Sequence, residues 1–146
     1  MKARSTKKRG LYVSYNEDRN GVFDEAVQIS KEPGGHLTWL DKSRRKPEEL
    51  HCPTDIFVRL KGHDGQERYF RGILDAINLA DNLDPNFALQ ERSHRPRVWR
   101  ERDDKACPLP NEDFKSVFFI RDLQEVPLPS EVKGRHPPQS PAYIEL

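Results

Sequence analysis

Alternating apolar and polar residues predict a β-hairpin over residues 55–77, near the middle of the chain. Ile56, Val58 and Leu60 recur at every second position, which is the period of a strand that buries one face. An Asp-Gly pair separates this run from the next, and glycine tolerates the positive φ that tight hairpin turns need. The return strand contains Gly72, where a β-bulge or a close approach of two backbones is expected.

Shorter patterns on both sides of the hairpin predict further elements. A contiguous apolar run is typical of a strand buried on both faces, and apolar residues three or four positions apart indicate a helix. The expected strands lie at 11–15, 36–40, 114–123 and 143–146, and the expected helical segments at 23–29, 47–50 and 76–83. This order predicts an α+β domain whose mixed, mostly antiparallel sheet curls into a small β-barrel with short helices and long loops.

Composition limits the size of the core. Of the 146 residues, 34 % are hydrophobic and 34 % are charged, so one compact core under a very polar surface is expected. Residues 1–9 are basic and are predicted to form a flexible tail, which leaves 10–146 as a single globular domain. Cys52 and Cys107 are far apart, and no disulfide is expected. No apolar run approaches the roughly 18 residues of a membrane span, so a cytoplasmic protein without a membrane partner is expected.

Arginines interleaved with a tryptophan form the main candidate binding sequence. The net charge is only +1, but basic residues cluster around Trp99. Arg95, Arg97 and Arg100 can donate to phosphates, and an indole can stack on a base with roughly 1–3 kcal/mol. Trp39 is a second candidate for stacking. The alternative is that Trp99 fills the core and that the arginines are its solvated flanks.

The hairpin offers two further candidates for a nucleic-acid contact. Arg59 and Arg71 lie on adjacent predicted strands, and two neighbouring cations persist more readily when an anion lies between them. Intramolecular salt bridges at both arginines would remove this reason. Tyr12, Tyr15 and Tyr69 could join the two tryptophans in an aromatic pocket for an extruded base, although each is also a candidate for the core.

Metal binding and catalysis have little support in the sequence. The histidines and cysteines show neither a CxxC nor an HxxxH pair, so no metal ligand and no cofactor is predicted. Glu131 and Lys133 match half of a metal-dependent nuclease motif, with Asp113 or Asp122 as a further carboxylate. The pair follows two prolines, where a loop is expected instead of the core strand that the motif needs.

The order of elements resembles that of PUA-like domains, the superfamily that includes the EVE, ASCH and YTH groups. In those domains a strand with a glycine, here Arg71-Gly72-Ile73, is followed by a decorated loop and by a strand that runs into prolines, here 114–129. The resemblance implies a non-catalytic domain that binds nucleic acid, DNA or RNA, and that reads a modified base. A small metal-dependent nuclease or hydrolase is one alternative. A protein-interaction module that docks on a partner of a larger system is the other.

Overall fold

The computed structural model describes nine stretches of the chain: 8–18, 22–41, 50–62, 65–79, 82–83, 91–97, 99–100, 115–138 and 141–146. Within them, a six-stranded sheet carries one α-helix on one face. The elements are β1 (Arg9–Asp18), α1 (Val22–Ser30), β2 (Leu37–Asp41), β3 (Thr54–Gly62), β4 (Glu67–Leu79), β5 (Ser116–Val126) and β6 (Ala142–Glu145).

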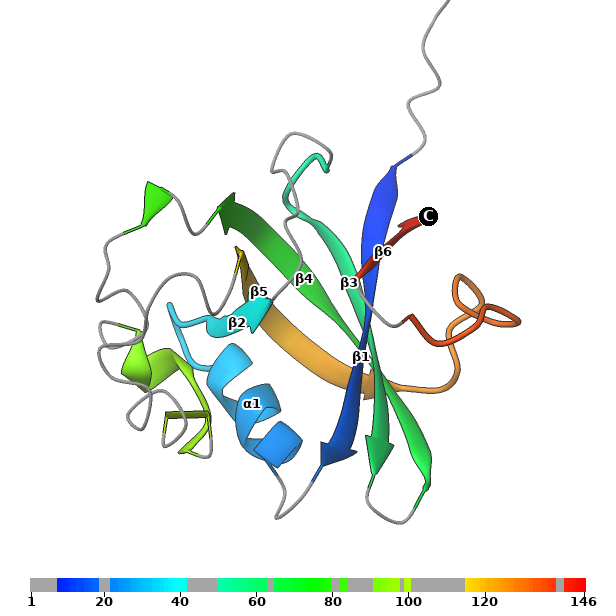
Figure 1. Ribbon diagram of the computed structural model, residues 1–146, viewed down its shortest axis with the longest axis horizontal. Helices are drawn as coiled ribbons and strands as arrows, with labels where there is room; N and C mark the ends of the chain where they lie inside the picture. The colour runs from blue at the N-terminus through cyan, green and yellow to red at the C-terminus, as the bar shows by residue number, and fades with distance from the viewer. Residues whose placement is uncertain are drawn as a thin grey trace, which may run out of the picture.

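The sheet is mixed and open. Its strand order is β2-β5-β4-β3-β1-β6, in which β1 and β3 are parallel and all other neighbours are antiparallel. The sheet is twisted, and β5 runs at a steep angle to β1 in Figure 1. The predicted mixed, mostly antiparallel α+β sheet is confirmed. The predicted closure into a barrel is not, because β2 and β6 stand at opposite edges of the sheet.

The predicted central hairpin is confirmed as β3 and β4, which pair in antiparallel register. Gly72 lies at a β-bulge, where two residues of β5 oppose one residue of β4. A Cβ atom at this position would lie 2.8 Å from Cδ2 of Leu123 and 3.0 Å from the carbonyl oxygen of Arg121. The glycine therefore allows the close approach that the sequence predicts.

The predicted helical segment at 76–83 is wrong over its first half, because β4 continues to Leu79. Ile77 is buried in the core and pairs with Phe118 of β5. A second bulge at Asp75 changes the alternation of buried positions, so the apolar spacing no longer has a period of two. Pairing with β5 thus outweighs the local helical pattern. The predicted helical turn at 47–50 falls almost entirely outside the described residues.

Helix α1 and β5 enclose the main core. Phe23, Ala26 and Ile29 form the buried face of the helix, at the spacing that the sequence predicts. The hydroxyl of Ser30 accepts a hydrogen bond of 3.1 Å from the backbone N–H of Leu123, which attaches the end of the helix to β5.

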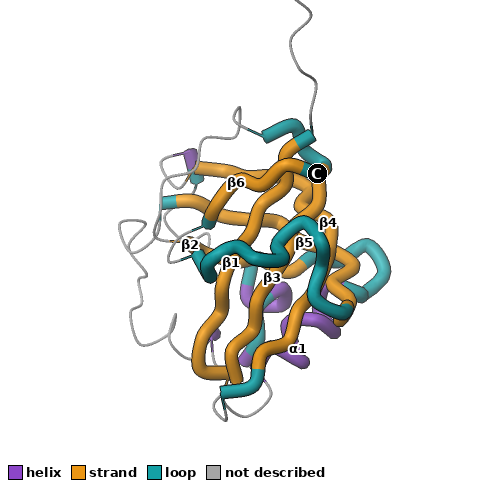
Figure 2. Tube along the Cα trace, turned by 90° about the vertical axis from the view of Figure 1, so that its right-hand side faces the viewer, coloured by secondary structure: helices purple, strands orange, loops and turns teal. Residues whose placement is uncertain are grey.

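The opposite face of the sheet has a smaller cluster. It contains Tyr12, Phe57, Val132 and Ile144, with Tyr69 packed against it. The turn that carries Val132 belongs to the segment 127–138, which crosses in front of β1 and β3 in Figure 2, while α1 lies behind the sheet. None of the helices in the described parts of the chain is long and apolar enough to cross a membrane.

Candidate metal centre

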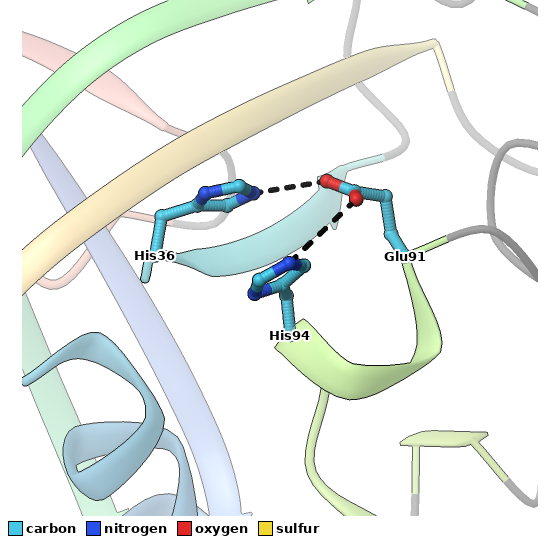
Figure 3. A group of neighbouring side chains, drawn as sticks. All are labelled: His36, Glu91 and His94. Carbon is cyan, nitrogen blue, oxygen red and sulfur yellow. Dashed lines mark hydrogen bonds and ion pairs between the residues drawn. The ribbon is translucent and has the colours of Figure 1, made fainter. Parts of the chain in front are cut away.

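Three side chains with metal-binding atoms converge beside the edge strand β2 (Figure 3). Nε2 of His36 lies 2.9 Å from Oε1 of Glu91, and Nε2 of His94 lies 4.0 Å from Oε2 of the same carboxylate. One ligand atom from each residue lies within 4.8 Å of the other two. Imidazole nitrogens and carboxylate oxygens are the atoms that bind Zn²⁺ and other first-row divalent metals in proteins.

His36 is positioned by the turn that follows α1. Gly34 has a φ of 69°, a left-handed conformation in which glycine is favoured. The next residue, Gly35, donates a backbone hydrogen bond of 2.9 Å to the carbonyl oxygen of Glu32. This tight turn ends the helix and places His36 immediately before β2.

The ring of His36 is held on two sides. It packs edge-on against Phe119 of β5, with ring centroids 5.1 Å apart. On another side it stacks on the ring of His94, at 4.2 Å and with an interplanar angle of 17°. Packing on both sides restricts the rotation of the imidazole, so its Nε2 stays directed at Glu91.

Glu91 and His94 come from one short turn, the 3-10 helix η3 (Arg92–His94) and the residue before it. The backbone N–H of His94 donates to the carbonyl oxygen of Glu91 at 2.9 Å. Side chains three residues apart eclipse in a 3-10 turn, which places both on the same side. The hydroxyl of Thr38 in β2 donates to Oε1 of Glu91 at 3.1 Å and orients the carboxylate.

The group is partly buried. Both histidine side chains are 28 % exposed, and the side chain of Glu91 is 17 % exposed. Nδ1 of His94 is buried, and it has no hydrogen-bond partner among the residues that the structure describes. His36 also contributes to the wall of a hollow of about 360 Å³ between the turn after α1 and β5. Because all three side chains are partly exposed, an ion from solvent can reach the site.

Two of the three residues of this site have a signal in the sequence. Glu91 and His94 form an E-x-x-H pair, a spacing that puts two ligands on one helical turn. A search for CxxC or HxxxH pairs misses this pair, because one of its two ligands is a glutamate. His36 has no local signal, because 55 residues separate it from Glu91 and only the fold brings the two together.

The two tryptophans predicted to stack on bases lie in the core. Trp99 is only 4 % exposed, and its Nε1 donates to the hydroxyl of Tyr15 at 3.1 Å. Trp39 is also buried and lies against both rings. Tyr12 and Tyr69 belong to the cluster on the opposite face of the sheet. The five aromatic residues therefore do not line one pocket. Trp99 fills the core, as the alternative to base stacking predicts.

The arginines near Trp99 have different environments. Arg95 is buried, and its NH1 donates to the carbonyl oxygen of Thr38 at 3.0 Å. Its guanidinium lies over the ring of Trp99, 5.3 Å from the centroid. Arg97 is exposed and Arg100 is half-buried. Of these three arginines, Arg97 is the most exposed.

The reason for adding Arg59 and Arg71 to a nucleic-acid site is removed by the structure. The register places Arg59 opposite Tyr69 and not opposite Arg71. NH2 of Arg59 lies 2.6 Å from Oε1 of Glu67, and NH2 of Arg71 lies 2.7 Å from Oδ2 of Asp55. Both arginines thus have carboxylate partners within the chain. The pair therefore gives no reason to expect a bound anion between them.

The proposed half of a nuclease motif lies in a turn, as its neighbouring prolines indicate. The backbone N–H of Lys133 donates to the carbonyl oxygen of Pro129, and Oε2 of Glu131 lies 3.7 Å from NH1 of Arg71. Asp122 is at the β5 bulge with a φ of 56°. Asp113 falls outside the described residues. Glu131 and Lys133 are therefore not presented by a core strand.

Comparison with known proteins finds no relative: the chain matches no protein-family model, no curated protein and no solved structure. The candidate metal centre therefore rests on the side chains of this chain. The PUA-like resemblance stays a prediction from the order of elements.

Proposed function

We propose that this domain binds one first-row divalent metal ion through His36, Glu91 and His94. The observation that carries the proposal is the convergence of one ligand atom from each residue within 4.8 Å, from segments far apart in the sequence. The two imidazoles and the carboxylate supply nitrogen and oxygen ligands together. This set suits Zn²⁺, Co²⁺ and Fe²⁺ better than Mg²⁺ or Ca²⁺, which prefer oxygen ligands.

The distances fit such a site after small movements. Tetrahedral geometry with bonds of about 2.0 Å separates neighbouring ligand atoms by about 3.3 Å. The observed separations from the Glu91 oxygens are 2.9 Å to His36 and 4.0 Å to His94. These two contacts use different oxygens of Glu91, and the three ligand atoms lie up to 4.8 Å apart. Side-chain torsions must therefore bring one carboxylate oxygen toward both imidazoles and shorten the widest separation by up to about 1.5 Å.

Three protein ligands leave at least one coordination position for water or a small ligand. Sites of this kind, with two histidines and one carboxylate, are typical of metals that keep an open position. Thr38 supplies an outer hydrogen bond to the carboxylate, as residues around metal ligands commonly do.

The competing interpretation is a hydrogen-bonded His-Glu-His group that stabilises the fold without metal. Isothermal titration calorimetry with Zn²⁺ separates the two. We expect one ion per chain in the wild type, and Glu91→Gln and His94→Ala should each weaken binding at least about tenfold, because each removes a ligand. His136→Ala is the control, because His136 is exposed and lies in a different segment. Equal binding in all four proteins, or no binding in the wild type, would overturn the proposal.

A further inference from the structure

The chain from 91 to 100, called here the 91–100 segment and described at 91–97, 99 and 100, connects the candidate metal centre to the core. Its first turn carries Glu91 and His94, which approach His36 just before β2. Its last part carries Trp99, which is buried in the main core. A movement of the segment away from β2 would therefore separate the ligands and open the core together.

Trp99 completes an aromatic cluster on the helix-bearing side of the sheet. Its ring centroid lies 5.8 Å from that of Tyr15 and 5.8 Å from that of Trp39. Tyr15 in turn contacts Phe23 of α1, with centroids 5.7 Å apart. Aromatic pairs at these distances contribute beyond the area that they bury. The cluster is complete only when the 91–100 segment is packed in place.

One residue of β2 contacts both parts of the segment. The hydroxyl of Thr38 donates to the carboxylate of Glu91, and its carbonyl oxygen accepts a hydrogen bond from Arg95. Arg95 also lies over the ring of Trp99. A continuous series of contacts therefore runs from the metal ligand Glu91 through Thr38 and Arg95 to Trp99.

Two backbone hydrogen bonds within the described part of this segment are local. The N–H of His94 donates to Glu91, and the N–H of Arg100 donates to Pro96. Side chains make the contacts to the sheet, and the N–H of Arg97 donates to the carboxylate of Glu25 in α1. Irregular segments held in this way open more readily than paired strands.

We infer that metal binding holds the 91–100 segment against β2 and thereby keeps the aromatic cluster closed, an inference that rests on the proposed function. A metal bonded to His36 and to both ligands of the segment ties its first turn to the sheet. Metal that binds the closed form alone shifts the equilibrium toward that form, and every event that opens the segment must weaken metal binding in return.

Limited trypsin digestion of the full chain, with and without saturating Zn²⁺, tests this inference. The bonds after Arg97 and Arg100 report on the segment, and the bond after exposed Lys133 serves as an internal control in a separate turn. Mass spectrometry gives the rate at each bond. We expect Zn²⁺ to slow cleavage within the segment at least about tenfold, since cleavage follows the population of the open form. Cleavage after Lys133 should stay within about twofold, because native-state cleavage of an exposed turn does not need that opening.

His94→Ala should lose the protection by Zn²⁺ in the segment, because it lacks one ligand. Calorimetry on the same samples shows whether the ion binds. Bound Zn²⁺ with unchanged cleavage after Arg97, or with equal slowing at Lys133, would overturn the inference and leave the proposed function intact. Absence of Zn²⁺ binding would overturn both.

Discussion

Nε2 of His36 lies 2.9 Å from Oε1 of Glu91, although 55 residues separate the two in the chain. The contact joins the turn after α1 to the short 3-10 turn that carries His94. It brings two imidazoles and a carboxylate together where the hydroxyl of Thr38 already orients the carboxylate. This arrangement supports a metal centre at the edge of the sheet more directly than any residue supports a nucleic-acid site.

Thr38→Val should weaken Zn²⁺ binding while the fold is kept. Valine retains the branched shape that suits β2 but removes the hydrogen bond to Glu91, and loss of such an outer contact typically costs about 10- to 100-fold in metal affinity. Calorimetry measures the change. Thr54→Val is the matched control, because the buried Thr54 hydroxyl donates to the carbonyl oxygen of Arg9, away from the site. Equal affinity in the two variants would argue against a role of Thr38.

Gly34→Ala should both destabilise the protein and weaken metal binding. Its φ of 69° is unfavourable for alanine by roughly 1–2 kcal/mol, and relaxation of the turn would displace His36. Gly134→Ala is the control. Gly134 has a similar φ, 79°, and equally open surroundings, but it lies in another turn. Thermal unfolding should show similar destabilisation of both variants. If Gly134→Ala also weakened Zn²⁺ binding, the effect of Gly34→Ala would not report on the position of His36.

Glu67→Gln should reduce stability in a pH-dependent way. Hydrogen bonds from Arg59, and then from Tyr69, lower the pKa of Glu67 below its ordinary value. A carboxyl group with a lowered folded-state pKa stabilises the fold above its unfolded pKa, and the contribution is lost as the pH falls through the folded pKa.

At pH 7 the loss in Glu67→Gln should be about 1–2 kcal/mol, between the values for exposed and for buried pairs, because Arg59 is buried but Glu67 is 43 % exposed. Urea unfolding should show this difference begin to shrink once the pH falls below the ordinary range of a glutamate carboxyl, and disappear as the pH falls through the lowered pKa of Glu67 in the folded state. Glu32→Gln, at an exposed position, is the control. A difference independent of pH would contradict the assigned role of the ion pair.

Nucleic-acid binding stays a prediction, and Arg97 is its best probe. Trp99→Ala is unsuitable, because loss of a buried tryptophan costs roughly 3–5 kcal/mol of stability whatever the ligand. If the prediction holds, short DNA or RNA should bind with a steep salt dependence, and Arg97→Ala should reduce the salt slope by about one. Arg135→Ala, which changes an exposed arginine in another turn, should leave the salt slope unchanged. No binding at low salt would end this hypothesis.

Local patterns predict the central hairpin and α1 well. The alternation at Ile56 and Val58 correctly predicts a strand, although Phe57 on its other face is buried as well. Gly65, with a φ of 84°, has the left-handed conformation that the sequence predicts for the turn. Gly72 was also informative, because a strand glycine has few roles besides a bulge or a close approach. Each of these features depends on residues close in sequence.

Features that depend on distant residues were not predictable. Whether β2 and β6 pair to close a barrel is decided by the twist of the whole sheet, to which no local pattern corresponds. The flanking arginines of Trp99 suggest an exposed ring, but the fold directs that ring at Tyr15. At the metal centre, Glu91 and His94 have a recognisable spacing, whereas His36 is recruited by tertiary structure.

The most direct test of the metal centre observes its ligand atoms. Two-dimensional ¹H–¹⁵N NMR of the histidine rings, recorded during titration with Zn²⁺, reports which nitrogen of each imidazole changes. We predict that Nε2 of His36 and a ring nitrogen of His94 shift together and saturate at one equivalent of Zn²⁺, while the ring of exposed His136 does not respond. Saturable shifts at other histidines, or no shift at His36 and His94, would contradict the account.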